Sequence, residues 1–188
     1  MCWSNSNSRA MAKSCLGESG DRWLHSQSVA NLAGQLRDMD MGVSDAVVAA
    51  AWLHDVGYAP ELAESGFHPI DGARWLRRQG VPEGVVALVA YHSGACFEAE
   101  ERGLVAELST FPEPDPEQLD ALNLADMTVG PKGERVPVAT RLGEILSRYP
   151  TDDPVHRAVT RSRGYLLESA ERAAARLGLS DVGTRAPI

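Results

Sequence analysis

The sequence has little cysteine, few aromatic residues and no long apolar run. Its three cysteines, Cys2, Cys15 and Cys96, lack CxxC spacing, which excludes a zinc knuckle and a disulfide framework, so we expect reduced thiols. No apolar run approaches the roughly 20 residues that cross a bilayer. The first residues also lack the apolar segment of a signal peptide. We therefore expect no membrane association and a cytoplasmic protein.

Positive charge is scarce as well. Lys and Arg number 18 against 26 Asp and Glu, which gives a net charge of −8, and the only lysines are Lys13 and Lys132. Because nucleic-acid polymers bind through clusters of basic residues and the sequence has no basic stripe, we expect no such partner. A small anionic substrate is still compatible with this charge, since a bound divalent ion reverses the local sign of charge.

What the sequence does contain is helical periodicity. Apolar residues recur every three to four positions over most of the chain, and no segment alternates as a strand would. We expect an all-α protein, with a disordered tail over residues 1–10 and a single helical-bundle domain over 11–188. The expected helices cover 21–38, 45–56, 68–79, 83–95, 98–108, 117–127, 138–149 and 154–177. The helix over 45–56 is apolar almost all round, so we place it at the centre of the bundle.

Imidazole and carboxylate side chains stand where a core is expected. Asp55 closes the apolar helix over 45–56, and Asp126 closes the apolar run ALNLAD. The fifth histidine, His156, lies where the last helix begins and is interpreted as a surface residue. The other histidines fall near helix ends or on apolar helix faces: His25, His54, His68 and His92.

These side chains fit a metal site. A carboxylate against a core is costly unless it is paired or coordinates a cation, and two carboxylates with four imidazoles can satisfy one another through metal. Mixed ligation of this kind suits Fe, Mn, Zn, Co or Ni better than Mg or Ca, so we expect one or two divalent transition-metal ions. Adjacent helical residues point about 100° apart, so His54 and Asp55 can reach one ion only near a helix end. Asp55 has two oxygens and could bridge two ions.

The pattern resembles the HD-domain superfamily of metal-dependent phosphohydrolases, which is named for a His-Asp dyad. WLHDVGY resembles the family's dyad signature and ALNLADMTVG its final Asp, and the resemblance extends from about residue 21 to residue 177. It implies a first metal ion held by four residues: His25, His54, Asp55 and Asp126. FHPIDGARWLRRQG and VALVAYHSGA resemble the extra histidines of a two-metal branch. They imply a second ion held by His68 and His92, with Asp55 as the bridge.

Two departures from the family pattern narrow this expectation. Many relatives follow the dyad with Ile-Gly-Lys, whose Lys is available to a phosphate, and Tyr58 stands in that place here. Phosphate binding must therefore come from another segment. Cyclic-dinucleotide phosphodiesterases of the HD-GYP group carry a Gly-Tyr-Pro motif that the sequence lacks, which argues against that activity.

The segment PKGERVPVATR, shortly after Asp126, supplies candidates for phosphate binding, because a guanidinium pairs well with phosphate oxygens. We expect Arg135 to be the main substrate-binding residue, with Lys132 and Arg141 as further candidates. Asp55 and Asp126 are the catalytic candidates, since either could orient a metal-bound hydroxide.

The sequence thus predicts a metal-dependent phosphohydrolase whose substrate is a phosphate ester or anhydride of a nucleotide or similar small molecule. Two other functions stay open, because the spacing of the ligands does not separate them. One is a di-iron oxygenase of the HD type, which shares the six ligands, and the other is a non-catalytic nucleotide-binding regulatory domain. The oligomeric state is open as well.

Overall fold

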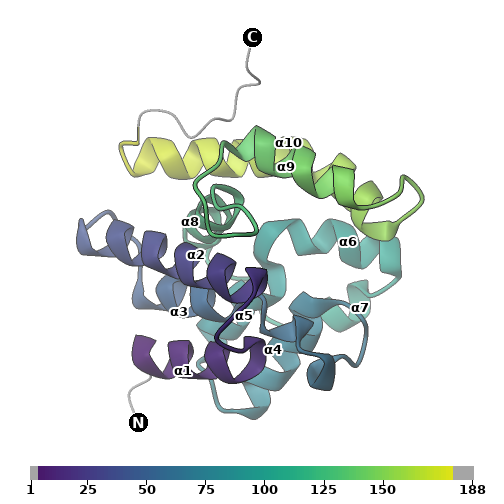
Figure 1. Cartoon of the computed structure of the whole chain (residues 1–188), viewed down its shortest axis with the longest axis horizontal. Coiled ribbons are helices and arrows are strands. Elements are labelled where there is room, and N and C mark those ends of the chain that lie inside the picture. Colours follow the sequence, from purple (N-terminus) through teal and green to yellow (C-terminus); the bar gives the residue numbers. More distant parts are fainter. Residues whose placement is uncertain (1–3, 180–188) are drawn as a thin grey trace.

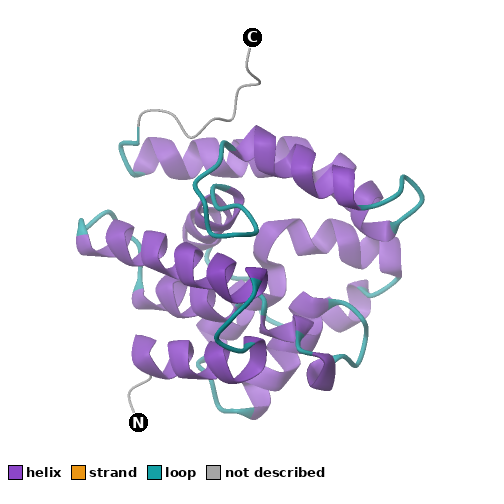
Figure 2. Cartoon of the chain, in the orientation of Figure 1, coloured by secondary structure: helices purple, strands orange, loops and turns teal. Residues whose placement is uncertain are grey.

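A computed structural model describes residues 4–179 and confirms the all-α class. Within that range every regular element is helical, apart from a single bridge between Val129 and Arg135 (Figure 2). No helix among these residues is long and apolar enough to span a membrane. The expected extent of the domain is not tested at its C-terminal end, because residues 180–188 lie outside the described residues.

The helices follow the predicted ranges closely from residue 21 onward. Residues 45–56 are helical only to Leu53, and the range 83–95 is an α-helix only to Tyr91. The range 98–108 is split at Gly103, which adopts a left-handed φ of 70°. In chain order the helices are α1 (Asn5–Leu16), α2 (Asp21–Asp38), α3 (Asp45–Leu53), α4 (His68–Arg78), α5 (Glu83–Tyr91), α6 (Ala95–Arg102), α7 (Val105–Leu108), α8 (Pro116–Met127), α9 (Val138–Arg148) and α10 (Pro154–Arg176). Short 3-10 turns cover Val56–Tyr58, Pro60–Leu62 and His92–Gly94.

The N-terminal segment corrects the expectation of a disordered tail over 1–10. Residues 5–10 form the first half of α1, and residues 1–3 lie outside the described part of the chain. Ser4 caps the helix by accepting a hydrogen bond from the backbone of Asn7. Ser8 and Ala12 are fully buried, because α1 packs along α3. The prediction was wrong because the segment is mostly polar, and its buried face consists only of small residues such as Ser8 and Ala12.

Helix α3 lies at the centre of the bundle, as predicted. Its residues from Val47 to Leu53 are all buried, and it packs against α1, α2, α5 and α8. The rings of Trp23 and Trp52 lie 5.7 Å apart and join α2 to α3. Figure 1 shows α1, α2 and α3 lying side by side. Because α3 is enclosed, the His54-Asp55 dyad at its end lies inside the molecule.

Helices α9 and α10 close the opposite side of the molecule. Figure 1 shows them together along one edge, with α8 between them and the α1–α3 group. Helix α10 packs against α6, α8 and α9, while α8 also contacts α2 and α3. Helix α8 therefore joins the two parts of the fold, and Asp126 in its last turn lies at their junction.

Gly57, two residues after the dyad, allows the chain to approach α4 closely. A Cβ atom at this position would overlap the carbonyl oxygen of His68 and the backbone nitrogen of Gly72. Only a residue without a side chain fits against the first turn of α4. This contact holds His68 next to the dyad.

Candidate metal centre

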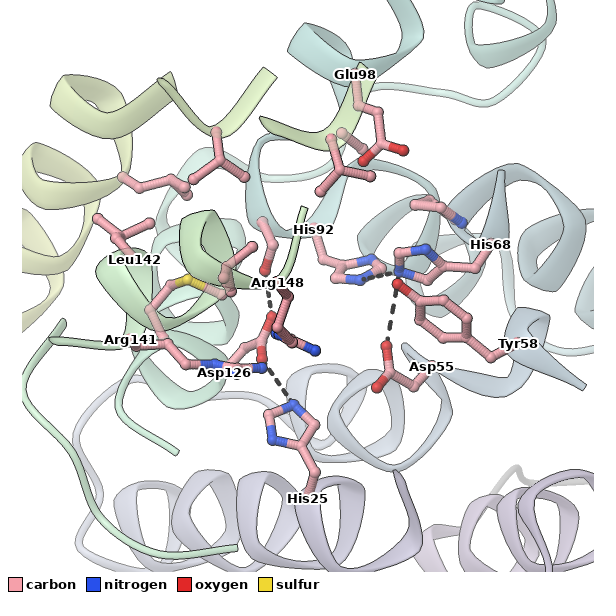
Figure 3. Close-up of a pocket in the computed structure, with 18 of the residues that line it drawn as sticks. His25, Asp55, Tyr58, His68, His92, Glu98, Asp126, Arg141, Leu142 and Arg148 are labelled. Carbon is pink, nitrogen blue, oxygen red and sulfur yellow. Dashed lines mark hydrogen bonds and ion pairs between the residues drawn. The ribbon is translucent and has the colours of Figure 1, made fainter. Parts of the chain in front are cut away.

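The fold brings all six candidate ligands together from five helices. Their atoms form two neighbouring groups, and within each group the ligand atoms lie within 4.8 Å of one another. Figure 3 shows His25, Asp55, His68, His92 and Asp126 around one pocket. The first group contains His25, His54 and Asp126, and the second contains Asp55, His68 and His92.

The first group is centred on Asp126. Its Oδ1 atom lies 2.9 Å from Nε2 of His25 and 3.9 Å from Nε2 of His54. All three residues are at most 4% exposed. A carboxylate oxygen and two imidazole nitrogens thus face one another inside the molecule.

The second group continues the first through Asp55. Oδ1 of Asp55 lies 3.6 Å from Nε2 of His54 and 3.6 Å from Nε2 of His68, so it stands between the two groups. Nε2 of His68 in turn lies 3.2 Å from Nε2 of His92. This position is the one that the sequence predicts for a bridging carboxylate.

Hydrogen bonds to the backbone fix how three of the imidazoles present their nitrogens. In each, Nδ1 faces a carbonyl oxygen, which can only accept, so Nδ1 carries the proton and donates. The distances are 3.1 Å from His25 to Gly130, 2.9 Å from His54 to Ala51 and 2.6 Å from His92 to Val89. In the neutral forms of His54 and His92, Nε2 therefore offers a lone pair to the pocket, the arrangement that histidine ligands of metals adopt. Nε2 of His25 instead pairs with Oδ1 of Asp126 at 2.9 Å, and this pairing raises the pKa of His25 despite its burial.

His54 gives the clearest sign that this pocket takes a cation. Its Nε2 atom is buried and has no hydrogen-bond partner within residues 4–179. Leaving a buried polar atom without a hydrogen-bond partner costs about 1–3 kcal/mol. Such an atom therefore indicates a partner that does not belong to the polypeptide, such as a bound ion. A divalent ion among these nitrogens and carboxylates would satisfy Nε2 of His54, and the donor set fits such an ion.

The charges of the site are set by opposing effects. Burial raises the pKa of the Asp55 carboxyl, but His54 and the Arg22 guanidinium outweigh it and hold that pKa well below its ordinary value. Burial acts on Asp126 in the same way, and His25 lowers its pKa overall. Burial lowers the pKa of His68 and of His92, which keeps both rings neutral at pH 7. Ionised carboxylates beside neutral imidazoles are the forms that bind metal.

Arg22 is a functional neighbour that the sequence reasoning missed. It donates to Oδ2 of Asp55 at 2.8 Å, and its guanidinium lies 3.6 Å from the ring centroid of Tyr58. Tyr58 in turn stacks on His68, with ring centroids 3.9 Å apart. The residue that replaces the expected Lys therefore supports His68 and Arg22. Arg22 precedes His25 by three residues, so helical spacing alone placed it on the same face.

Ser93 is a second neighbour that was missed. Its hydroxyl donates to Oδ2 of Asp126, and its backbone N–H donates to Oδ1 of Asn123 at 2.7 Å. Ser93 has a left-handed φ of 52°, which is unfavourable for a residue with a side chain, so the two hydrogen bonds hold a strained turn. Its position directly after the predicted ligand His92 could have identified Ser93 as a neighbour of the site.

Of the three basic residues predicted to bind substrate, the structure brings only Arg141 to the pocket. Lys132 and Arg135 are exposed and do not belong to its described lining. The segment after Asp126 turns back on α2, where Gly130 accepts from His25 and the backbone N–H of Lys132 donates to Glu134. That anchoring draws the loop away from the pocket mouth.

Other residues complete the pocket on the side of α6 and α9. Arg148 lines it and reaches into it in Figure 3, while Glu98 lines it from α6 and pairs with Arg102 at 2.7 Å. Burial raises the pKa of Glu98. His156 lies outside both ligand groups. It is half-buried rather than on the surface, and its Nδ1 donates to the carbonyls that end α9.

Residues 22–128 match the HD domain family, and the chain belongs to that family. The matched range contains all six ligands but neither Arg141 nor Arg148. HD domains bind divalent metals, and the two groups described above are placed to do so. A stretch of 77 residues, 41% of this chain, is 35% identical to the tRNA (cytidine(56)-2'-O)-methyltransferase of Thermoplasma volcanium. That stretch covers 22% of the methyltransferase. No solved structure matches the chain.

Proposed function

We propose that this chain is a metal-dependent phosphohydrolase that cleaves a phosphate ester or anhydride of a small molecule. The observation that carries the proposal is the pair of buried ligand groups joined through Oδ1 of Asp55, with arginines lining the same pocket. Membership of the HD domain family supports the same class of reaction. The ion would be one or two of Fe, Mn, Zn, Co or Ni, which favour mixed imidazole and carboxylate ligands.

The chain's own groups divide the work as follows. When bound, the divalent ions would make a water molecule more acidic and stabilise negative charge on the phosphate oxygens. Asp55 and Asp126, ionised at neutral pH, would hold the cations and could accept hydrogen bonds from an attacking water. The four imidazoles, when unprotonated, would supply lone pairs to the ions.

Phosphate oxygens need donors in addition to the metal, and Arg141 and Arg148 are placed to provide them. Both line the pocket and both extend from α9. Guanidinium groups form paired hydrogen bonds with phosphate oxygens. The proposed roles of Arg135 and Lys132 stay predictions, with weaker support because the described pocket does not include them.

Glu98 is the candidate for protonating the leaving oxygen. Burial raises the pKa of its carboxyl, so it holds a proton to higher pH than an exposed glutamate does. Figure 3 shows its carboxyl group on the pocket side that faces His68 and His92. Asp71, although it follows His68 by three residues, is committed elsewhere, because it accepts hydrogen bonds from Ser65 and Gly66.

The decisive experiment separates hydrolysis from oxygen chemistry. The protein is prepared with and without air, its metals are measured, and phosphate release is screened over nucleotides and simple phosphate esters, with Asp55→Ala as the inactive control. We expect metal-dependent phosphate release that Asp55→Ala abolishes. Two irons per chain with oxygen consumption and no phosphate release would refute the proposal in favour of the di-iron oxygenase. Nucleotide binding without turnover would favour the regulatory domain.

A further inference from the structure

We propose that the substrate is a small phosphate compound with a short aliphatic body, and that the pocket selects this class over nucleotides. This inference rests on the proposed function and deepens it. The pocket, about 660 Å³ including its open mouth, has a charged half at the metal ligands and an aliphatic half between α9 and α10. The charged half would bind the phosphate group of the substrate, and the aliphatic half would bind its hydrocarbon body.

The charged half has a built anion site. Arg141 is 5% exposed, one of its terminal nitrogens pairs with Glu144, and its Nε donor is buried without a partner in the described part of the chain. A buried guanidinium donor without a partner fits an anionic ligand. Arg148 lies two turns further along α9, so it faces the same way, and it pairs with Glu144 as well. Glu144 thus holds both arginines on one face of α9.

The aliphatic half begins next to these arginines. Leu142 and Ile145 follow Arg141 on α9, and α10 adds branched side chains opposite them. Figure 3 shows Leu142 on the side of the pocket that lies away from His68 and Tyr58. The aliphatic lining consists of Leu142, Ile145, Val155, Val159 and Leu166. Such a wall can bind hydrocarbon but cannot hydrogen-bond to a sugar or a base.

Amide side chains, which read the edges of nucleobases, are missing from the described lining, and of its aromatic residues only the partly exposed Tyr149 is open to stacking. The lining contains no Asn or Gln to pair with the edge of a base. Tyr58 cannot stack on one, because His68 and the Arg22 guanidinium both lie within 4 Å of its ring centroid and so occupy opposite faces. Tyr91 lies outside the lining, and its hydroxyl donates to the backbone carbonyls of Leu108 and Phe111.

A series of alkylphosphonates tests this proposal, since these compounds carry the anionic head and resist hydrolysis. Binding of methyl-, ethyl-, propyl- and butylphosphonate to the metal-loaded full chain is measured by calorimetry. Each methylene that enters the aliphatic half should tighten binding about threefold to fourfold, from about 0.8 kcal/mol per buried methylene. Nucleoside monophosphates should bind more weakly than butylphosphonate.

Matched variants place the effect at the proposed wall. Val159→Thr keeps the shape of the side chain but adds a hydroxyl, so the ratio of the methyl- to the butylphosphonate dissociation constants should fall at least threefold. Val105→Thr makes the same change at a position that is 49% exposed and outside the pocket, and the ratio should stay as in the wild type. Arg141→Lys should weaken all four phosphonates by a similar factor.

The possible failures can be told apart. Equal affinity for all four phosphonates, or tighter binding of nucleoside monophosphates than of butylphosphonate, would overturn the aliphatic substrate class. Metal-dependent phosphate release would still support the proposed function in that case. If none of the phosphonates bound and no phosphate ester were cleaved, the proposed function would fail together with this inference.

Discussion

Helix α8 carries two buried aspartates, Asp120 and Asp126, whose surroundings differ. Asp120 accepts from the Ser169 hydroxyl at 2.6 Å and from Arg172 at 2.9 and 3.0 Å, and Arg176 pairs with it as well. Every charge in this cluster is met by protein groups. Around Asp126, the nearby Nε2 of His54 has no partner among the described residues, and several lone pairs face each other.

The difference separates a structural polar cluster from the one that we propose to be functional. A buried carboxylate that serves the fold is closed by donors from the same chain, as at Asp120. One that serves chemistry lies among further ligand atoms that could share an ion with it, as we propose for Asp126 beside His25 and His54. The two clusters are connected, because Asn123 donates to Ser169 on one side and accepts from Ser93 on the other.

The largest expected effect comes from the carboxylate between the two ligand groups. Asp55→Ala should lower phosphate release more than about 100-fold and remove bound metal, because even changes beyond the direct ligands of a metal cost 10–100-fold. Activity and elemental analysis of the purified variant check this. His156→Ala is the control, since His156 lies outside both groups, and it should keep metal and turnover. Full metal content in Asp55→Ala would show that the site is wrongly placed.

The opposite pattern is expected at Asp120. Asp120→Ala leaves the buried Ser169 hydroxyl without its acceptor, while the half-exposed Arg172 can be solvated, so the free energy of unfolding should fall by about 1–3 kcal/mol, with turnover per folded molecule within twofold of wild type. Denaturant unfolding and activity measure the two effects. If Asp120→Ala lost bound metal and activity while its stability stayed unchanged, Asp120 would belong to the functional cluster.

The same residue predicts a pH dependence. Burial raises the pKa of Asp120, but Arg172 and Ser169 lower it overall below its ordinary value. Its contribution to stability is therefore complete above the unfolded-state pKa of about 3.9 and is lost as the pH falls through the lower folded-state value. The difference in unfolding free energy between wild type and Asp120→Ala should accordingly shrink below about pH 4. A difference that grew on acidification would contradict this assignment.

Ser93 tests the connection between the clusters. Ser93→Gly removes the hydroxyl that donates to Asp126 but tolerates the left-handed backbone, so it isolates the hydrogen bond from the strain. We expect metal affinity to fall about tenfold, with less loss of stability than in Ser93→Ala. Metal titration and unfolding experiments distinguish these outcomes. Unchanged metal affinity in Ser93→Gly would reduce Ser93 to a turn residue.

The smallest expected effect concerns which basic side chains bind the substrate. Arg148→Ala should raise KM about tenfold through loss of a charge-assisted hydrogen bond. Lys132→Ala should change KM less than twofold, because Lys132 is exposed outside the pocket. Steady-state kinetics on one phosphate ester compares them. A larger increase in KM from Arg135→Ala than from Arg148→Ala would support the substrate-binding role that the sequence predicts for the segment after Asp126.

The sequence predicted most of the helices, and it predicted that the six ligands lie close together. Both predictions were possible because apolar periodicity, and ionisable residues within apolar segments, can be recognised in the sequence alone. It could not show how the chain turns after Asp126. There the hydrogen bond from His25 to Gly130 draws the loop to α2, a contact across 105 positions. It also assigned residues 5–10 to a tail, since their burial depends on α3 and not on their own composition.

Metal titration tests the central claim most directly. The metal-depleted chain is titrated with Mn²⁺ or Zn²⁺, and the bound ions are counted by elemental analysis after dialysis. The convergence of lone pairs around Asp126 and Asp55 predicts saturation at two ions per chain, with neither ion retained when His54 and Asp55 are both replaced by alanine. A wild-type chain that binds no ion, or a double variant that binds as many as the wild type, would contradict the account.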